Sequence, residues 1–417
     1  MKIAIIGSGI AGLTAAYYLS PEHDITVFEA ADYIGGHTHT HDIAMAGKTY
    51  AVDTGFIVFN DWTYPNFIKL LSELGVAHQP SAMSFSVKCD NTGLEYNGTT
   101  LNSLFAQRLN LLKPSFLRMI RDILRFNKQA PELLQAADET ITLGAYLSAN
   151  RYGEEFIRYY ILPMGAAIWS STPEQMLGFP ARYFVRFFHN HGMLSVDNRP
   201  VWRVIQGGSK QYIAKLTQRF AQRIRLNTPI QSVIRQGQSA SVTPANGAAE
   251  QFDAVVFACH SDQALRLLAD PSAAEQNILG AIQYQDNEAV LHTDASILPR
   301  RRLAWAAWNY HIPKAQRERV ALTYNMNILQ SLNPPETLCV TLNYSEHINP
   351  DKIIKRIQYH HPLYTPEGVA AQQRHSDISD VNRSYYCGAY WGFGFHEDGV
   401  NSALRVVAQI NQDYGHA

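Results

Sequence analysis

The feature that most constrains the fold is a glycine pattern placed directly after the first hydrophobic run. Residues 2–6 (KIAII) predict a short buried strand, and Gly7-x-Gly9-x-x-Gly12 leads into a helix predicted over Ala11–Leu19. A second strand is predicted at Ile25–Glu29, which ends on an acidic residue. Glu29 follows the glycines at the spacing of about 20 residues that is typical of a ribose-binding carboxylate. This order predicts a βαβ unit that holds a dinucleotide pyrophosphate at the helix N-terminus, rather than an ordinary glycine-rich turn.

Composition excludes several other classes. The 417 residues are 46% hydrophobic with a net charge of −1, so a large core is expected and a global attraction to nucleic acid is not. The four cysteines lack any C-x-x-C pattern, which argues against a disulfide framework or a cysteine metal site and favours a cytoplasmic protein. No apolar run is long enough to span a membrane. Lys2–Pro21 imitates a signal peptide, but its glycines fit a nucleotide-binding turn better.

Further along the chain the patterns change and then return. Helices and aromatic residues dominate from 60 to about 200. Strand patterns come back near Ile224–Ile234, at Gln251–Ala258, between 280 and 350 (including Leu338–Leu342), and at Tyr385–Ala389, before a helix from about Gly399. Nucleotide-type elements at both ends and in the middle predict one discontinuous domain with insertions, not two domains in series.

Motifs along the whole chain resemble the flavin amine oxidase and phytoene desaturase superfamily. They are Gly35-Gly36 after Glu29, Val52–Phe56, Val201–Ile213, Pro229–Val233 with Asp253–Ala258, and Tyr386–Leu404, in which Gly388 precedes Glu397. The resemblance implies noncovalent FAD rather than NAD. The residues it implies at the FAD site are Gly7, Gly9, Ile10, Ala11, Gly12, Glu29, Ala30, Gly35, Gly36, His37, Thr54, Gly55, Phe56, Ile230, Val233, Ala258, Cys259, Gly388, Trp391, His396, Glu397, Gly399 and Val400.

The fold class that follows is α/β with an α+β insert. A discontinuous Rossmann-like FAD-binding domain is expected over 1–60, 200–275 and 380–417, and a mixed helical and antiparallel-sheet substrate domain over 61–199 and 276–379. A narrower resemblance is to bacterial predicted NAD/FAD-binding proteins associated with cyclopropane-fatty-acid-type methyltransferases, some relatives of which look like desaturases of methylated acyl chains.

The chain departs from this superfamily at two places. His37 replaces the Arg of many relatives, so phosphate affinity is predicted to depend on pH. The Lys that amine oxidases of the family hold near the flavin is missing, because no Lys occurs from Leu216 to Pro313. In the corresponding region Glu288, His292 and Asp294 are the proton acceptors we would test, Glu288 and His292 first. His37, His39 and His41 alternate as on one strand face beside the cofactor, and we expect no metal there.

One further segment bears on partners. Ser115–Lys128 predicts a basic amphipathic helix, which either lies on an anionic membrane or packs on its own core. We therefore expect a cytoplasmic protein that can contact the inner face of the membrane peripherally and that has no nucleic-acid partner. The sequence gives no prediction of oligomeric state.

The expected activity is two-electron dehydrogenation of a hydrophobic, fatty-acyl or lipid substrate with hydride transfer to flavin. The alternatives are a flavin amine oxidase that uses O2, and a flavin-binding protein without catalysis.

Overall fold

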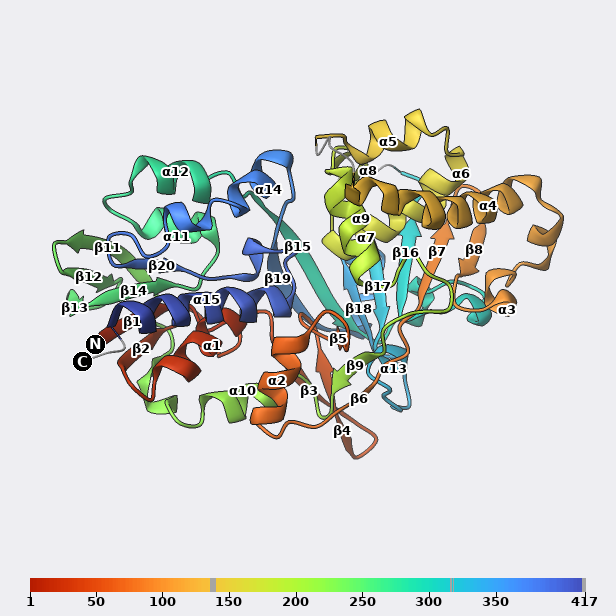
Figure 1. Ribbon diagram of the computed structural model, residues 1–417. Helices are drawn as coiled ribbons and strands as arrows, with labels where there is room; N and C mark the ends of the chain where they lie inside the picture. The colour runs from red at the N-terminus through yellow and green to blue at the C-terminus, as the bar shows by residue number, and fades with distance from the viewer. Residues whose placement is uncertain (136–139, 316, 318, 415–417) are drawn as a thin grey trace.

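A computed structural model describes residues 1–135, 140–315, 317 and 319–414. Helices and strands alternate along the chain, and Figure 1 shows two bodies joined by two long strands. The helices are α1 (Ile10–Leu19), α2 (Pro65–Glu73), α3 (Leu101–Leu104), α4 (Pro114–Gln129), α5 (Leu143–Ala149), α6 (Glu154–Phe156), α7 (Leu162–Trp169), α8 (Pro173–Leu177), α9 (Ala181–Asn190), α10 (Lys210–Thr217), α11 (Ser261–Leu267), α12 (Ala273–Leu279), α13 (Met326–Leu329), α14 (Pro366–Gln372) and α15 (His396–Tyr414).

The first body is built on a parallel five-stranded sheet, which confirms the predicted α/β class. Its order is β10-β2-β1-β14-β20, with bounds Ile224–Arg225, Asp24–Phe28, Lys2–Ile6, Ala254–Phe257 and Ser384–Tyr386. β1 and β2 are buried on both faces after their first residue, as parallel strands covered by helices must be. In register, Ile3 pairs with Ile25 on one side and with Ala254 on the other. Strands from three distant segments thus meet in one sheet, while the domain boundaries at 60, 199, 275 and 379 stay a prediction.

The predicted strand Gln251–Ala258 is in fact two strands. β13 (Glu250–Phe252) is antiparallel to β12 (Ser239–Pro244), whereas β14 joins the parallel sheet. Asp253 separates them, because its carboxylate accepts a hydrogen bond from Lys2 N at 2.7 Å and its own N–H donates to Lys2 O at 2.8 Å. β11 (Ile230–Gln236) completes this three-stranded sheet, and α12 packs near it (Figure 1).

The second body is built on a mixed seven-stranded sheet. Its order is β19-β15-β18-β17-β16-β7-β8, with bounds Ile353–Pro362, Tyr284–His292, Cys339–Leu342, Ala321–Asn325, Trp308–Ile312, Phe85–Cys89 and Leu94–Asn97. α4 to α9 cover one side of this sheet, and β15 and β19 extend from it toward the first body (Figure 1). Helices do dominate 60–200 as predicted, but the β7–β8 hairpin within that stretch was not foreseen.

Two small sheets lie between these bodies. β3 (Thr40–Met45) pairs with β4 (Lys48–Asp53), and β9 (Trp202–Ile205) lies between β5 (Val58–Asn60) and β6 (His78–Pro80). The four cysteines are free thiols. Within the described part of the chain, none of the helices combines the length and the apolar character that crossing a bilayer requires.

Candidate functional site

A cavity of about 760 Å³ lies between the two bodies. This volume is within the range of cofactor and small-molecule sites. Its wall contains most of the residues that the sequence assigned to a dinucleotide: Gly7, Gly9, Ile10, Ala11, Glu29, Ala30, Gly35, Gly36, His37, Thr54, Gly55, Phe56, Ile230, Ala258, Cys259, Gly388 and His396. The opposite wall comes from the second body.

The turn between β1 and α1 provides a cradle of backbone. Gly7 has φ +108°, and a Cβ there would lie 2.8 Å from Ala258 O, so glycine is required. A Cβ on Gly9 would meet no atom within 4 Å, which leaves the cavity side of this turn open for a close ligand. Gly9 is also the N-cap of α1 and supplies no side-chain cap, so the first N–H groups of the helix stay available to phosphate oxygens.

Glu29 stands at the end of β2 with its carboxylate held in place. Its Oε2 accepts hydrogen bonds from Ser8 N at 2.9 Å and Ser8 Oγ at 2.6 Å, and its Oε1 accepts from Ala31 N at 2.8 Å. A carboxylate has about four acceptor positions, so one remains for a ligand hydroxyl. The side chain is therefore oriented before any nucleotide binds.

Asp53 connects two of the predicted motifs, Val52–Phe56 and Val201–Ile213, by hydrogen bonds. Its carboxylate accepts from Ser209 N at 2.9 Å, Thr40 Oγ1 at 2.5 Å and Gln330 Nε2 at 2.8 Å. These bonds hold Asp53–Gly55 against the N-terminus of α10, which follows Gly207-Gly208. Burial raises the pKa of Asp53 to about 6, against the opposing hydrogen bonds. Its role is architectural, since it places Thr54, Gly55 and Phe56 in the cavity wall.

His37 lies in the wall, but its protonation differs from expectation. Burial, with smaller contributions from His361 and His260, lowers the pKa of His37 well below its usual value. The ring stacks on Tyr359 with centroids 4.9 Å apart, and its buried Nε2 has no hydrogen-bond partner among the described residues. His37 is therefore a neutral side chain that offers one ring nitrogen to a ligand, and the predicted pH-sensitive charge is not supported.

The three alternating histidines do not share one strand face. β3 begins only at Thr40, and His37 points into the cavity wall, whereas the rings of His39 and His41 lie 4.2 Å apart. Burial lowers the pKa of His41 to about 4. In the part of the chain that the structure describes, no three His, Cys, Asp or Glu side chains converge to hold a metal ion.

Four residues of the assigned set have packing roles, and for Gly12 close packing is what the glycine fingerprint requires. A Cβ on Gly12 would lie 2.0 Å from Gly7 O, so this glycine lets α1 start close to the preceding turn. A Cβ on Gly399 would lie 2.8 Å from Ile10 Cγ2, so this glycine lets α15 pack closely on α1. Val233 and Val400 are fully buried core residues.

Two further assigned residues are also used elsewhere. Glu397 accepts hydrogen bonds from Asn66 N at 3.0 Å and Phe67 N at 2.8 Å, so it caps α2 rather than facing the cavity. Trp391 is buried, and its ring lies edge-on to the ring of His375 with centroids 4.6 Å apart. Its neighbour Tyr390 reaches the cavity wall in its place, together with Phe393 and Phe395.

The residues chosen as proton acceptors lie away from the cavity. Glu288 accepts hydrogen bonds from Ser345 Oγ at 2.5 Å and pairs with Arg356 at 2.7 Å. His292 is buried against Thr341 Oγ1 at 2.7 Å, and burial lowers its pKa to about 4. The carboxylate of Asp294 accepts from Ser296 N at 3.1 Å and caps a short helical turn. Successive side chains of β15 point to opposite faces of the sheet, and the sequence alone does not show which face borders the cavity.

The far wall of the cavity forms what we call the aromatic chamber: Ile168, Trp169, Trp308, Tyr324, Leu329, Leu342 and Tyr364. Three of its polar atoms are buried without a partner among the described residues, namely Trp169 Nε1, Trp308 Nε1 and Tyr364 OH. Buried polar groups in native proteins are normally paired. These groups therefore indicate a ligand or ordered water that carries hydrogen-bond acceptors.

A hydrogen-bond chain orients His361 at the edge of the chamber. Glu288 N donates to Asn343 Oδ1 at 2.9 Å, Asn343 Nδ2 donates to Asn287 Oδ1 at 2.8 Å, and Asn287 Nδ2 reaches His361 Nδ1 at 3.3 Å. Because the first donor is a backbone N–H, each amide orientation follows from the previous one. His361 Nδ1 is thus an acceptor and Nε2 carries the hydrogen. Burial lowers the pKa of His361 to about 4, which keeps the ring neutral.

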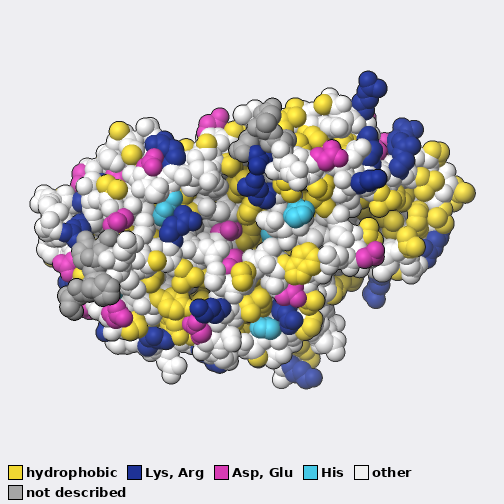
Figure 2. Space-filling view, viewed as in Figure 1, with side chains coloured by type: hydrophobic (Ala, Val, Ile, Leu, Met, Phe, Trp, Pro, Cys, Tyr) yellow, Lys and Arg dark blue, Asp and Glu magenta, His cyan; other side chains and the backbone are white. Residues whose placement is uncertain are grey.

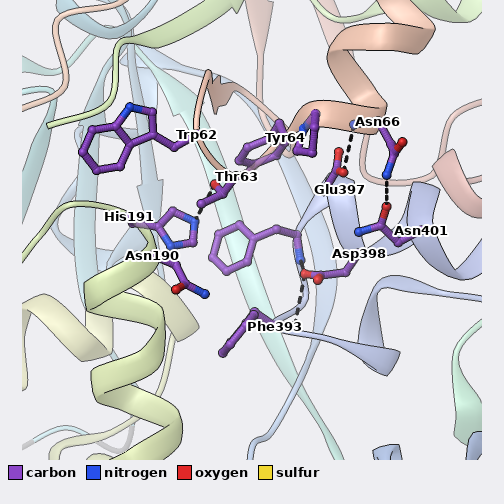
Figure 3. A pocket seen from close by; sticks show the side chains of 12 residues that line it. Trp62, Thr63, Tyr64, Asn66, Asn190, His191, Phe393, Glu397, Asp398 and Asn401 are labelled. Carbon is purple, nitrogen blue, oxygen red and sulfur yellow. Dashed lines mark hydrogen bonds between the residues drawn. The ribbon is translucent and has the colours of Figure 1, made fainter. Parts of the chain in front are cut away.

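A second, smaller cavity of about 430 Å³ adjoins the first (Figure 3). Phe393 and Phe395 line both cavities, so they form the partition between them. Asp398 holds this partition, since its carboxylate accepts from Phe393 N at 3.0 Å and Phe395 N at 2.9 Å. Burial raises the pKa of Asp398 to about 7.

Comparison with known proteins places this site. The profile of the family described as flavin containing amine oxidoreductase matches residues 10–292. An inferred flavin-containing monoamine oxidase of Mycobacterium tuberculosis is 25% identical over 258 residues, which are 60% of this chain and only 55% of that relative. The match therefore spans about half the length of the curated relative.

Solved structures agree on the fold. Cyclohexylamine oxidase from Brevibacterium oxydans superposes with a TM-score of 0.71 at 14% identity, covering 100% of this chain and 99% of that one. A CLA-producing fatty acid isomerase from P. acnes superposes with a TM-score of 0.68 at 15% identity, covering 99% of this chain and 98% of that one. The open cradle, the oriented Glu29 and the unpaired His37 nitrogen fit a flavin dinucleotide. The chain belongs to the flavin containing amine oxidoreductase family, whose cofactor is FAD.

Proposed function

We propose that this protein is an FAD-dependent oxidoreductase that dehydrogenates an apolar, acyl-type substrate held in the aromatic chamber. One observation carries the substrate class. The chamber offers unpaired donors at Trp169, Trp308 and Tyr364, while none of its described wall residues is Asp, Glu, Lys or Arg. An indole N–H can only donate a hydrogen bond, and an ammonium group also only donates. A substrate with an apolar chain and an acceptor group, such as a carboxyl or ester, satisfies this wall better than a cationic amine.

The roles of the chain's own residues follow from their positions. The bound FAD supplies the two-electron acceptor. The aromatic chamber binds the apolar part of the substrate and keeps water out of the reaction site. His361 Nε2 adds one more donor at the chamber edge, fixed in its tautomer by Asn287. The narrower resemblance of the sequence, and a fold shared with a fatty acid isomerase, support an acyl substrate.

An amine oxidase that passes electrons to O2 is the second candidate. The family and the amine oxidases among its relatives and structural neighbours favour it. An amine bound in its neutral form would present a lone pair to the indole donors. Against this candidate stands the absence of a lysine from the described cavity wall.

Flavin reduction distinguishes these candidates. The purified, FAD-loaded protein is mixed anaerobically with fatty acids and acyl lipids, and separately with polyamines and aromatic amines, while the flavin absorbance is followed. We expect bleaching with an acyl compound and none with amines. Bleaching and peroxide release with amines alone would assign the amine oxidase function. A flavin that stays oxidised with every compound would indicate a flavin-binding protein without catalysis.

Matched variants connect this activity with the chamber. Trp169→Phe and Trp308→Phe each remove one unpaired donor but keep an aromatic ring. We expect each to weaken the apparent affinity for an acyl substrate about fivefold or more, as the loss of one hydrogen bond predicts. Trp62→Phe, outside this cavity, is the control. Variants indistinguishable from this control would contradict the role of the donors.

A further inference from the structure

Leucine side chains gather at one end of the second body. Five of them, which we call the leucine cluster, come from α3, the following short helical turn Arg108–Leu112 and the first turn of α4. Their exposed fractions are 77% for Leu101, 73% for Leu109, 50% for Leu111, 80% for Leu112 and 43% for Leu117. Hydrophobic atoms cover the corresponding end of the molecule in Figure 2. Contiguous exposed apolar surface of this kind marks a contact site.

The segment that carries these leucines is firmly held. Arg108 Nη1 donates to Phe105 O at 2.8 Å and to Asn102 O at 3.1 Å. Gln107 Nε2 donates to Gly93 O at 2.7 Å, in the turn between β7 and β8, and Gln107 Oε1 accepts from Glu95 N at 3.1 Å. Polar side chains thus fasten the segment to the body while the leucines face outward. Their exposure is a consequence of this anchoring, not of a frayed end.

The charged residues of the segment that carries the leucine cluster are all basic. Residues 97–121 contain no Asp or Glu, but they contain Arg108, Lys113, Arg118 and Arg121. α3 contacts the short turn Arg302–Ala304, which continues a run of three exposed arginines from Arg300. Of the acids nearby, Glu95 and Asp122 are buried, and Glu95 accepts from Arg300 N at 2.8 Å, whereas Glu155 lies beside Arg118.

We propose that the leucine cluster inserts into the surface of an anionic lipid bilayer, with these cations at the headgroup level. A group of exposed aliphatic side chains with Lys and Arg around it matches the interfacial pattern of membrane-bound proteins. The cores of protein interfaces instead favour aromatic residues and Met, which the leucine cluster lacks. This inference goes beyond the proposed reaction, because it does not depend on which substrate is oxidised.

The contact differs from the one that the sequence predicted. The apolar face of α4 (Phe116, Met119 and Phe126) is buried against its own body. The helix therefore packs on the core rather than lying on a membrane by that face. Its solvent side adds Arg118 and Arg121 to the cationic surround. The docking surface lies beside β8 and β7, in the sheet whose strands β16 and β17 also wall the aromatic chamber.

Flotation of the full-length, FAD-loaded chain with lipid vesicles tests this proposal. Vesicles of equal parts phosphatidylglycerol and phosphatidylcholine are compared with pure phosphatidylcholine. We expect binding to the anionic vesicles that is roughly tenfold tighter than to the neutral ones and that weakens as salt is raised. The double variant Leu109→Ser/Leu112→Ser should lose at least roughly tenfold in affinity, a change of about 1.4 kcal/mol.

A matched control and three contrary outcomes make the test decisive. Val196→Ser/Ile354→Ser removes two exposed aliphatic side chains elsewhere, at 62% and 41% exposure, and should leave binding unchanged. Flavin absorbance and melting temperature report that each variant is folded. Wild-type protein that stays with neither vesicle type would overturn the proposal. So would an equal loss in the control, or leucine variants that dissociate a dimer in sedimentation without changing flotation.

Discussion

Replacing Glu29 by Gln should weaken FAD binding through the adenosine end of the cofactor. In the wild type the carboxylate already accepts three hydrogen bonds, from Ser8 N at 2.9 Å, Ser8 Oγ at 2.6 Å and Ala31 N at 2.8 Å. The amide of Gln keeps one acceptor oxygen, so a ribose hydroxyl then competes with Ser8 or Ala31 for it. The variant should therefore lose a charge-assisted hydrogen bond to the ligand.

The size of the effect follows from the strength of that bond. A hydrogen bond to a charged group contributes about 1.5–3 kcal/mol, and about 1.4 kcal/mol corresponds to a tenfold change in Kd. The Kd of FAD should therefore rise roughly 10- to 150-fold in Glu29→Gln. Titration of the apoprotein with FAD, followed by flavin fluorescence at fixed pH and salt, measures it.

Two comparisons isolate the cause. Glu22→Gln changes an exposed acid in the turn before β2 and should leave the Kd unchanged. FMN lacks the adenosine ribose, so its affinity should differ little between Glu29→Gln and wild type. An unchanged Kd for FAD, or equal weakening of FAD and FMN, would refute the assignment of Glu29 to the ribose.

Three other predictions concern buried ionisable groups. Arg235 and Glu275 form a buried pair in which Arg235 Nη2 donates at 2.9 Å, so Arg235→Met leaves a buried acid unpaired at a cost of about 3–5 kcal/mol. With an unfolding entropy of about 2.1 cal/mol/K per residue over 417 residues, the melting temperature should fall by roughly 3–6 °C in a thermal melt. Recovery in Arg235→Met/Glu275→Leu would support the cause, and a loss below about 1 °C in the single variant would exclude it. In the folded protein the pKa of Asp398 is raised to about 7, so the folded state binds this proton more tightly than the unfolded chain does. The free energy of unfolding of the wild type should therefore fall by up to about 4 kcal/mol as pH rises from about 4 to 7. Asp398→Asn should flatten this slope in melts across that range, and an unchanged slope would assign it to other groups. His37 has a strongly lowered pKa and stays neutral, so the Kd of FAD should vary with pH equally in wild type and His37→Gln between about pH 6 and 8. A pH dependence that disappears in the variant, measured by the same FAD titration, would show that His37 is charged.

Local patterns were enough to predict the first βαβ unit. β1, the glycine turn and α1 are contiguous, and the conformations they need are dictated by residues next to one another. Gly7 requires a positive φ, and Gly12 must be small because Gly7 O lies where its Cβ would be. A regular spacing also located Glu29. These features survive any change in the rest of the molecule, since they depend on neighbours within one turn or one strand pair.

Sites that depend on strand facing or helix register were predicted less well. Glu288 and His292 were chosen from a stretch of sequence alone, yet β15 directs them toward Arg356 and Thr341. The resemblance assigned Glu397 to the FAD site, yet α2 lies close enough to take its carboxylate as a cap. Conversely, only the structure shows that the indole donors of Trp169 and Trp308 are unpaired and lie in the cavity wall. No sequence signal distinguishes a buried indole with a partner from one without.

The sequence by itself thus determined the dinucleotide cradle, the α/β class and the family resemblance, because each rests on short-range geometry and spacing. Only the tertiary structure decided which side chains face the cavity, that His37 is neutral, and that the outward leucines between α3 and α4 stand among cations. Burial and long-range packing set those properties. Desolvation acts through every neighbour in space, whatever its distance along the chain.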